Sequence, residues 1–150
     1  MAGTVIVCTD GSELSRKAIL AGLEVLRPDA DLLVVAVTEQ PDPTLVSGTG
    51  FAGGTKSPEA FEQLTRDMEM AGESAVREAA ALIGPDRVQT RVLSGDAGPA
   101  VCSLAEEIGA AAIVLGSRGR GGMKRALLGS VSDFVVRNAP CPVVVTSTPG

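Results

Sequence analysis

The chain has 150 residues and a formal net charge of −5, and it contains no histidine, tryptophan or tyrosine. Without histidine, a Ser-His-Asp triad, a Cys-His dyad and any histidine-ligated metal site are excluded. The acidic charge and the scarcity of aromatic residues exclude nucleic acid as an expected partner, because such ligands are held by cations and stacked rings.

The length predicts one domain spanning residues 1–150 with a hydrophobic core of its own. No apolar run approaches the ~18 residues that a membrane span needs, and the amino terminus lacks the basic start of a signal peptide. Cys8, Cys102 and Cys141 are widely spaced, which is typical of reduced thiols that fill a core. We therefore expect a cytoplasmic protein with no membrane partner.

The amino-terminal half alternates β and α patterns. A β-rich run over residues 5–8 precedes Ser12, a favoured helix N-cap, and a helical pattern that ends before Pro28. The apolar run over residues 32–37 predicts a strand buried on both faces. The predicted inner face of the first helix consists of Leu14, Ala18, Ala21 and Val25.

Residues 39–57 hold many glycines and prolines, which predicts a long irregular connection. Two interpretations stay open for this segment: a lid over a ligand, or a flexible connection without a further role.

The carboxyl-terminal half continues the alternation. Pro58 predicts the first residue of a second helix that ends before Gly84, with Phe61, Leu64, Met68, Ala75, Ala79 and Leu82 as its apolar face. An edge strand over residues 88–92, a helix over 99–108 and strands over 111–115 and 142–146 follow, with a last helix after residue 130. Strands that alternate with helices in this way predict a doubly wound parallel sheet of five strands with four helices on its two faces.

The segment from Gly116 to Ser130 connects the fourth strand to the last helix, and it combines glycines with cations. The cations are Arg118, Arg120, Lys124 and Arg125, and no acidic residue occurs between Glu107 and Asp133. A glycine loop between a strand and a helix start predicts a phosphate site, because backbone N–H groups there approach an anion closely. The alternative is a tight turn with solvated charges, in which Ser130 and Asp133 form an ordinary capping box.

Two familiar phosphate-binding patterns do not fit this segment. The chain has no Gly-Lys pair for a Walker loop, and Lys124 stands where a dinucleotide fingerprint needs its third glycine. The spacing of Gly116, Gly119 and Gly129-Ser130 instead resembles the G-2x-G-9x-G-(S/T) signature of the ATP-binding branch of the universal stress protein family. The opening VIVCTDGS and the ending APCPVVVT are similar to that family too, so the resemblance covers nearly the whole chain.

The resemblance implies a strand order of 3-2-1-4-5 and a nucleotide between strands one and four, where the order of such a sheet reverses. It implies that Asp10 contacts the ribose and that the backbone of Val37 meets adenine. The implied ribose and phosphate contacts are Gly116, Gly119, Gly129, Ser130 and Val131. From the residues alone, Asp10 belongs equally well to a turn that begins a helix.

The function that the resemblance implies is an ATP-binding regulatory protein of the stress response, with ATP and Mg²⁺ as ligands. It also implies a homodimer through strand five, although Pro140 and Pro142 would alternatively blunt the sheet edge of a monomer. Two other functions stay open: a slow ATPase or phosphotransferase that uses the same pocket, and an adapter that binds a cyclic nucleotide or none.

Overall fold

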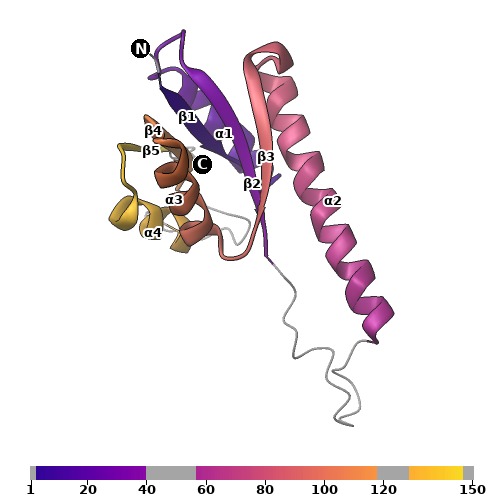
Figure 1. Ribbon diagram of the computed structural model, residues 1–150. Helices are drawn as coiled ribbons and strands as arrows, with labels where there is room; N and C mark the ends of the chain where they lie inside the picture. The colour runs from indigo at the N-terminus through magenta and orange to yellow at the C-terminus, as the bar shows by residue number, and fades with distance from the viewer. Residues whose placement is uncertain (1–2, 40–56, 118–128, 147–150) are drawn as a thin grey trace.

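The computed structural model describes residues 3–39, 57–117 and 129–146 (Figure 1). In chain order its elements are β1 (Thr4–Cys8), α1 (Glu13–Leu23), β2 (Asp31–Thr38), α2 (Pro58–Ile83), the short 3₁₀ helix η2 (Pro85–Arg87), β3 (Val88–Ser94), α3 (Ala97–Ile108), β4 (Ala112–Gly116), α4 (Ser130–Asn138) and β5 (Val143–Thr146).

The strands form one sheet in the order β3-β2-β1-β4-β5, and every neighbouring pair is parallel. This confirms the predicted doubly wound sheet and its order. The order reverses beside β1: the chain builds outward through β2 and β3, then returns to add β4 and β5 on the other side. Val7 pairs with Val114 across the reversal, so β1 and β4 end at the same edge of the sheet.

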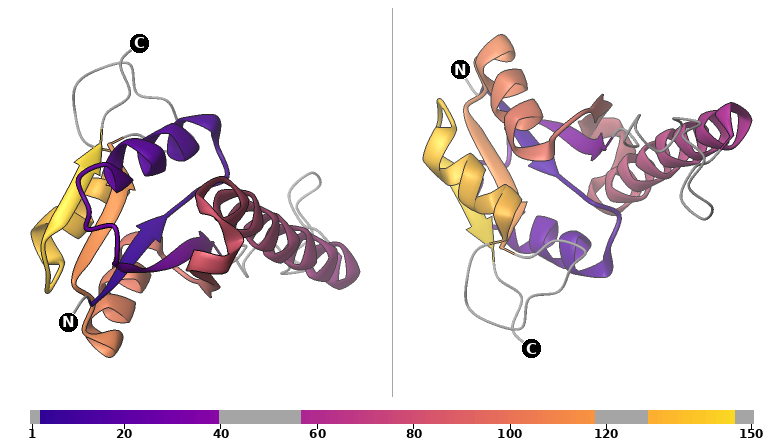
Figure 2. Two further views of the ribbon diagram at one scale, coloured as in Figure 1. Left: turned by 90° about the horizontal axis from the view of Figure 1, so that it is seen from above. Right: turned by 90° about the horizontal axis from the view of Figure 1, so that it is seen from below.

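The sheet separates two hydrophobic cores, and Figure 2 shows helices on both of its faces. Val5 and Val7 point toward α1 and α2, whereas Ile6 points toward α3 and α4, because successive strand residues face opposite sides. The residues from Leu32 to Ala36 are all buried, which explains why β2 reads as an uninterrupted apolar run.

The predicted inner face of α1 is confirmed at Ala18 and wrong at Ala21 and Val25, which are exposed. Its buried residues are Ser15, Ala18, Ile19 and Gly22, and Val25 lies beyond the helix with 70% of its surface exposed. Gly22 explains the change, because a Cβ at this position would lie 2.4 Å from Val114 Cγ1. The helix therefore approaches the sheet through its small residues.

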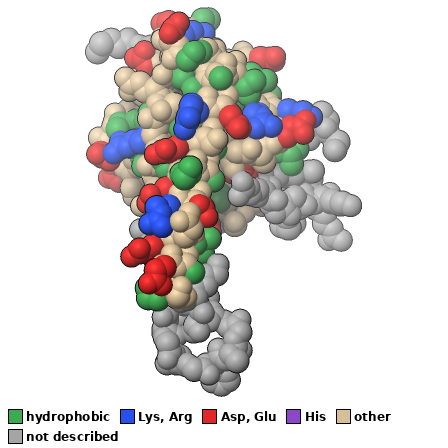
Figure 3. Space-filling view, turned by 90° about the vertical axis from the view of Figure 1, so that its right-hand side faces the viewer, with side chains coloured by type: hydrophobic (Ala, Val, Ile, Leu, Met, Phe, Trp, Pro, Cys, Tyr) green, Lys and Arg blue, Asp and Glu red, His purple; other side chains and the backbone are tan. Residues whose placement is uncertain are grey.

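The inner face of α2 is also built of small side chains: Gly72, Ala75, Val76, Ala79 and Ala80. Leu82, predicted to face inward, is 47% exposed. The first part of α2 projects past the sheet (Figure 1), and acidic side chains gather on this projecting part (Figure 3). No helix in the described part of the chain is long and apolar enough to cross a membrane.

Candidate functional site

The candidate site lies where β1 and β4 end. From this edge the chain continues from β1 into α1 on one face of the sheet, and α4 packs on the other face. In doubly wound sheets such a reversal leaves a crevice between the diverging connections, and ligands bind there. Asp10 follows β1 by two residues, and Ser117 directly follows β4.

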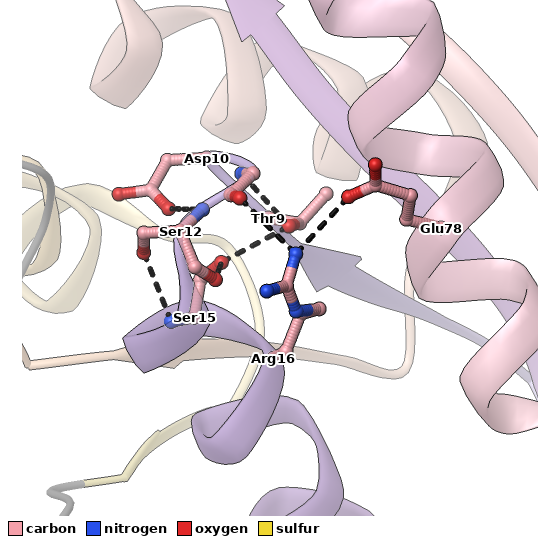
Figure 4. A network of polar contacts seen from close by, with 7 residues as sticks. Thr9, Asp10, Ser12, Ser15, Arg16 and Glu78 are labelled. Atoms are coloured by element: carbon pink, nitrogen blue, oxygen red, sulfur yellow. Dashed lines mark hydrogen bonds and ion pairs between the residues drawn. The ribbon is translucent and has the colours of Figure 1, made fainter.

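Asp10 belongs to a turn that begins α1 (Figure 4). Its carboxylate Oδ1 accepts a hydrogen bond of 2.8 Å from the backbone N–H of Ser12. Ser12 is the N-cap, as predicted, and its hydroxyl accepts from the N–H of Ser15 at 3.1 Å. Between them Gly11 has a φ of +81°, a left-handed conformation that favours glycine. The turn therefore fixes both the backbone around Asp10 and one oxygen of its carboxylate.

The start of α4 is joined to the ends of β4 and β5. The N–H of Gly129 donates to the Ser117 carbonyl at 2.7 Å, and the N–H of Ser117 donates to the Thr146 carbonyl at 2.8 Å. The first N–H groups of a helix have no partner inside the helix, and the helix dipole favours negative charge there. This end of α4 is therefore suited to an anion.

The capping box of Ser130 and Asp133, which belonged to the alternative interpretation of this segment, is not formed. Gly129 is the N-cap and makes no side-chain cap bond, and Ser130 is already the first helical residue. The hydroxyl that supports this end belongs to Ser132, which is 2% exposed and donates to the Gly129 carbonyl at 3.0 Å. Asp133 instead pairs with Arg137 Nε at 3.1 Å, one turn further along α4.

The predicted site residues that the structure describes lie at or near the carboxyl ends of strands or at the start of α4. Asp10 lies after β1, Val37 near the end of β2, and Gly116 at the end of β4, while the remaining three are Gly129, Ser130 and Val131 at the start of α4. Gly119 lies outside the described residues. The same is true of the four predicted cations: Arg118, Arg120, Lys124 and Arg125.

The backbone of Gly129 helps to separate the two interpretations of the glycine segment. Its φ of −63° and ψ of 164° are extended values that any residue adopts. Gly129 is thus not needed to relieve a strained turn, in contrast to Gly11. Two other physical reasons for a glycine remain: the preference for glycine at an N-cap, and a close approach of another group to this backbone.

Sequence reasoning missed several polar residues around the site. Ser117 and Ser132 were not singled out, nor were Thr9 and Ser15, which lie buried beneath the turn of Asp10. Arg16 was missed as well, although its Nη1 bonds Glu78 Oε2 at 3.0 Å and so ties α1 to α2. A small polar residue at a position that helical spacing makes inward is the signal that would have found Ser15 and Ser132.

The Asp, Glu and Cys side chains are the possible metal ligands in the described part of the chain. No group of three or more Cys, Asp or Glu side chains there is placed to hold a metal ion. The three cysteines are free and pack against the core on the α3 and α4 side. Burial raises the pKa of the Cys8 thiol to about 12, and it raises the pKa values of Cys102 and Cys141 as well, so these thiols stay protonated.

Comparisons with known proteins indicate the same family over nearly the whole chain. The model of the universal stress protein family matches residues 1–147. Universal stress protein YxiE of Bacillus subtilis is 30% identical over 149 residues, covering 97% of this chain and 99% of that protein. A universal stress protein of Thermus aquaticus is 36% identical over 143 residues, covering 95% of this chain and 96% of that protein.

Two solved structures share the fold. A universal stress protein in complex with cAMP has a TM-score of 0.67 at 24% identity and covers 98% of both chains. A universal stress protein family protein of Arabidopsis thaliana with AMP bound has a TM-score of 0.60 at 20% identity, covering 99% of this chain and 93% of that one. The family model and the two sequence relatives span nearly the full length, so the chain belongs to the universal stress protein family.

Proposed function

We propose that this protein binds ATP in the crevice between β1 and β4 and acts as a regulatory protein of the stress response. The observation that carries the proposal is that two different features lie at the same edge of the sheet. A carboxylate fixed by its own turn follows β1, and a glycine-capped helix start is bonded to the end of β4. The first suits a sugar hydroxyl, and the second suits a phosphate.

The charges of the two features support a defined orientation of the nucleotide. Asp10 would repel phosphate, so we assign its carboxylate to the ribose hydroxyls and the start of α4 to the phosphates. In this proposal Gly116, Gly129, Ser130 and Val131 contact ribose or phosphate, Gly119 extends the phosphate contacts, and the backbone of Val37 meets adenine. Mg²⁺ would be held mainly by the phosphates, because this ion keeps several waters and is usually bound through substrate phosphates and one or two carboxylates.

The bound nucleotides of the two solved relatives support the class of ligand. One relative is in complex with cAMP and the other has AMP bound, so adenine is common to both. The choice of ATP rests on the spacing of Gly116, Gly119 and Gly129-Ser130 in this chain.

The first experiment identifies the nucleotide that the purified protein binds. Without Trp or Tyr the chain absorbs weakly in the near-ultraviolet, so an adenine band that persists through gel filtration reports occupancy. ATP with Mg²⁺ at ~100 times the Kd should stabilise the fold by about 2.7 kcal/mol, which for this size raises Tm by roughly 5–11 °C. No adenine band and no shift in Tm would refute the proposal.

Two variants and two competing nucleotides sharpen this experiment. Ser130 is exposed at the first position of α4, so Ser130→Ala should leave Tm nearly unchanged and weaken ATP binding. Asp10→Asn should weaken ATP more than it weakens dideoxy-ATP, which lacks both ribose hydroxyls. If cAMP or AMP binds as tightly as ATP, the adenine-nucleotide site stands but the choice of ATP is wrong.

We further propose a cytoplasmic homodimer joined through β5. The described residues place β5 at an edge of the sheet, next to β4 alone. Exposed strand edges favour pairing, and a two-fold axis would let the same edge of a second copy cover it. The free cysteines agree with a reducing compartment.

A further inference from the structure

Two hydroxyl side chains lie buried beneath the turn that carries Asp10. Thr9 is 6% exposed and Ser15 is 5% exposed, and together with Ser132 they are the buried polar residues of the described chain. Thr9 continues β1, because its backbone N–H donates to the Val35 carbonyl at 2.9 Å. Ser15 lies on the inner face of α1. Buried hydroxyls need hydrogen-bond partners, so each hydrogen bond of Thr9 and Ser15 contributes to holding the local structure.

The directions of the hydrogen bonds follow from counting protons. Ser15 Oγ lies 2.9 Å from the Ser12 carbonyl oxygen, which can only accept, so the single proton of Ser15 is used there. Thr9 is therefore the donor in the contact of 3.1 Å between Thr9 Oγ1 and Ser15 Oγ. Thr9 Oγ1 itself accepts from the Gly11 N–H at 3.2 Å. The three hydrogen bonds thus form a series: the Gly11 N–H donates to Thr9, the Thr9 hydroxyl donates to Ser15, and the Ser15 hydroxyl donates to the Ser12 carbonyl.

This chain of bonds fixes the backbone on both sides of the turn. The Gly11 N–H belongs to the peptide group directly after Asp10, and the Ser12 carbonyl ends the turn. Between these two groups, Arg16 Nη1 lies 3.4 Å from the Gly11 carbonyl and also bonds Glu78 of α2. Figure 4 shows the Asp10 carboxylate on the opposite side of the turn from Arg16 and Glu78. The buried hydroxyls thus bond the backbone of the turn, whereas the carboxylate of Asp10 bonds the Ser12 N–H.

We infer that Thr9 and Ser15 are positioning residues for the nucleotide, which act by holding the Asp10 carboxylate in the orientation that meets the ribose. This inference rests on the proposed function. Neither residue touches the ligand. Without the Thr9 hydroxyl, the Gly11 N–H is left without its acceptor, which weakens the support of the turn and lets the carboxylate shift.

Thr9→Val tests this inference, because valine keeps the shape of threonine and removes only its hydroxyl. We expect ATP affinity to fall roughly five- to thirty-fold, the equivalent of one buried hydrogen-bonded group. The preference for ATP over dideoxy-ATP should fall with it. In an Asp10→Ala background Thr9→Val should change ATP affinity by less than about twofold, because the carboxylate that Thr9 is inferred to position is already absent.

Thr65→Val is the matched control, because it removes a threonine hydroxyl that donates to the Phe61 carbonyl at 3.0 Å within α2. It should leave ATP affinity unchanged. Thr9→Ser, which restores the hydroxyl, should recover most of the affinity. If Thr9→Val does not fold, Ser15→Ala carries the same test, because it removes the acceptor of the Thr9 proton.

The outcomes separate this inference from the function on which it rests. Equal losses of affinity with and without Asp10, or no loss in Thr9→Val and Ser15→Ala, overturn the positioning role while ATP binding stands. A wild-type protein that binds no adenine nucleotide overturns the proposed function itself, and the inference with it.

Discussion

Two glycines at the candidate site offer a direct test of why glycine occurs there. Gly11 has a φ of +81°, and a Cβ added to it would lie 3.3 Å from Ala75 Cβ. Gly129 has a φ of −63° and a ψ of 164° at the start of α4. Alanine at the first position meets a strained backbone and a tight contact, whereas alanine at the second meets an ordinary backbone. The two substitutions should therefore separate stability from binding.

The expected change in stability follows from these conformations. Gly11→Ala should lower the free energy of unfolding by about 1–2 kcal/mol, the cost of a left-handed conformation for a residue with a Cβ. For a chain of this size that lowers Tm by roughly 2–8 °C. Gly129→Ala should stay within about 1 kcal/mol of the wild type, because the lower unfolded-state entropy of alanine offsets its poorer N-cap preference.

The expected change in binding runs the other way. If phosphate approaches the backbone at Gly129, an added methyl group prevents at least one charge-assisted hydrogen bond. Such bonds contribute about 1.5–3 kcal/mol, so ATP affinity should fall about ten- to 150-fold. Titration calorimetry measures the affinity, and urea unfolding without nucleotide measures the stability of each variant.

Wild-type affinity in Gly129→Ala would refute the argument that this backbone approaches phosphate. A loss of stability in Gly129→Ala as large as that in Gly11→Ala would show instead that the glycine is structural. The turn interpretation of the segment from Gly116 to Ser130 would then be the better one.

Two further predictions concern the thiols and the sheet edge. Because burial raises the pKa of Cys8 from 9.0 to about 12, its contribution to stability is constant below pH 9 and declines above it as the unfolded thiol ionises. Urea unfolding, measured at several pH values from neutral to alkaline, should show this decline in the wild type and a smaller decline in Cys8→Ala. Equal pH profiles of the two proteins would contradict the raised pKa of Cys8. At the edge, Ile113 and Ser117 donate to the Pro142 and Thr146 carbonyls, so Val143 and Val145 direct their backbone groups away from β4. Val145→Pro removes an outward N–H and should shift a wild-type dimer toward monomer in light scattering, whereas a monomeric wild type at micromolar concentration would refute the interface.

The sheet was predictable from sequence because its strands have unambiguous patterns. The five residues from Leu32 to Ala36 are buried in succession, and a short uninterrupted apolar run of this kind is typical of a central parallel strand. β3 lies at an edge, and its alternating pattern predicted that place. The α3 helix begins at Ala97, two residues before the predicted start at Pro99, because proline is tolerated inside the first turn.

The inner face of α1 and part of that of α2 were not predictable from large apolar residues, because these two helices pack closely against the sheet. Gly22 and Ser15 face the sheet in α1, and Gly72 faces it in α2, where an added Cβ would lie 2.7 Å from Thr38 Cγ2. A pattern search that follows leucine and valine misses such residues. The supports of the candidate site were missed for the same reason, since Ser15 and Ser132 are small, polar and buried.

We predict that the candidate site holds a nucleotide without cleaving it. Phosphoryl transfer needs a metal ion and a group that orients the attacking oxygen. The chain has no histidine that could orient an attacking oxygen. Oδ1 of Asp10 already accepts from Ser12, and in our proposal this carboxylate binds ribose, away from the phosphates. We therefore expect ATP bound to the purified protein to remain intact during prolonged incubation with Mg²⁺. Chromatography of the released nucleotide checks this, and ADP that accumulates in proportion to protein, and is lost with Asp10→Asn, would show instead that the site is catalytic.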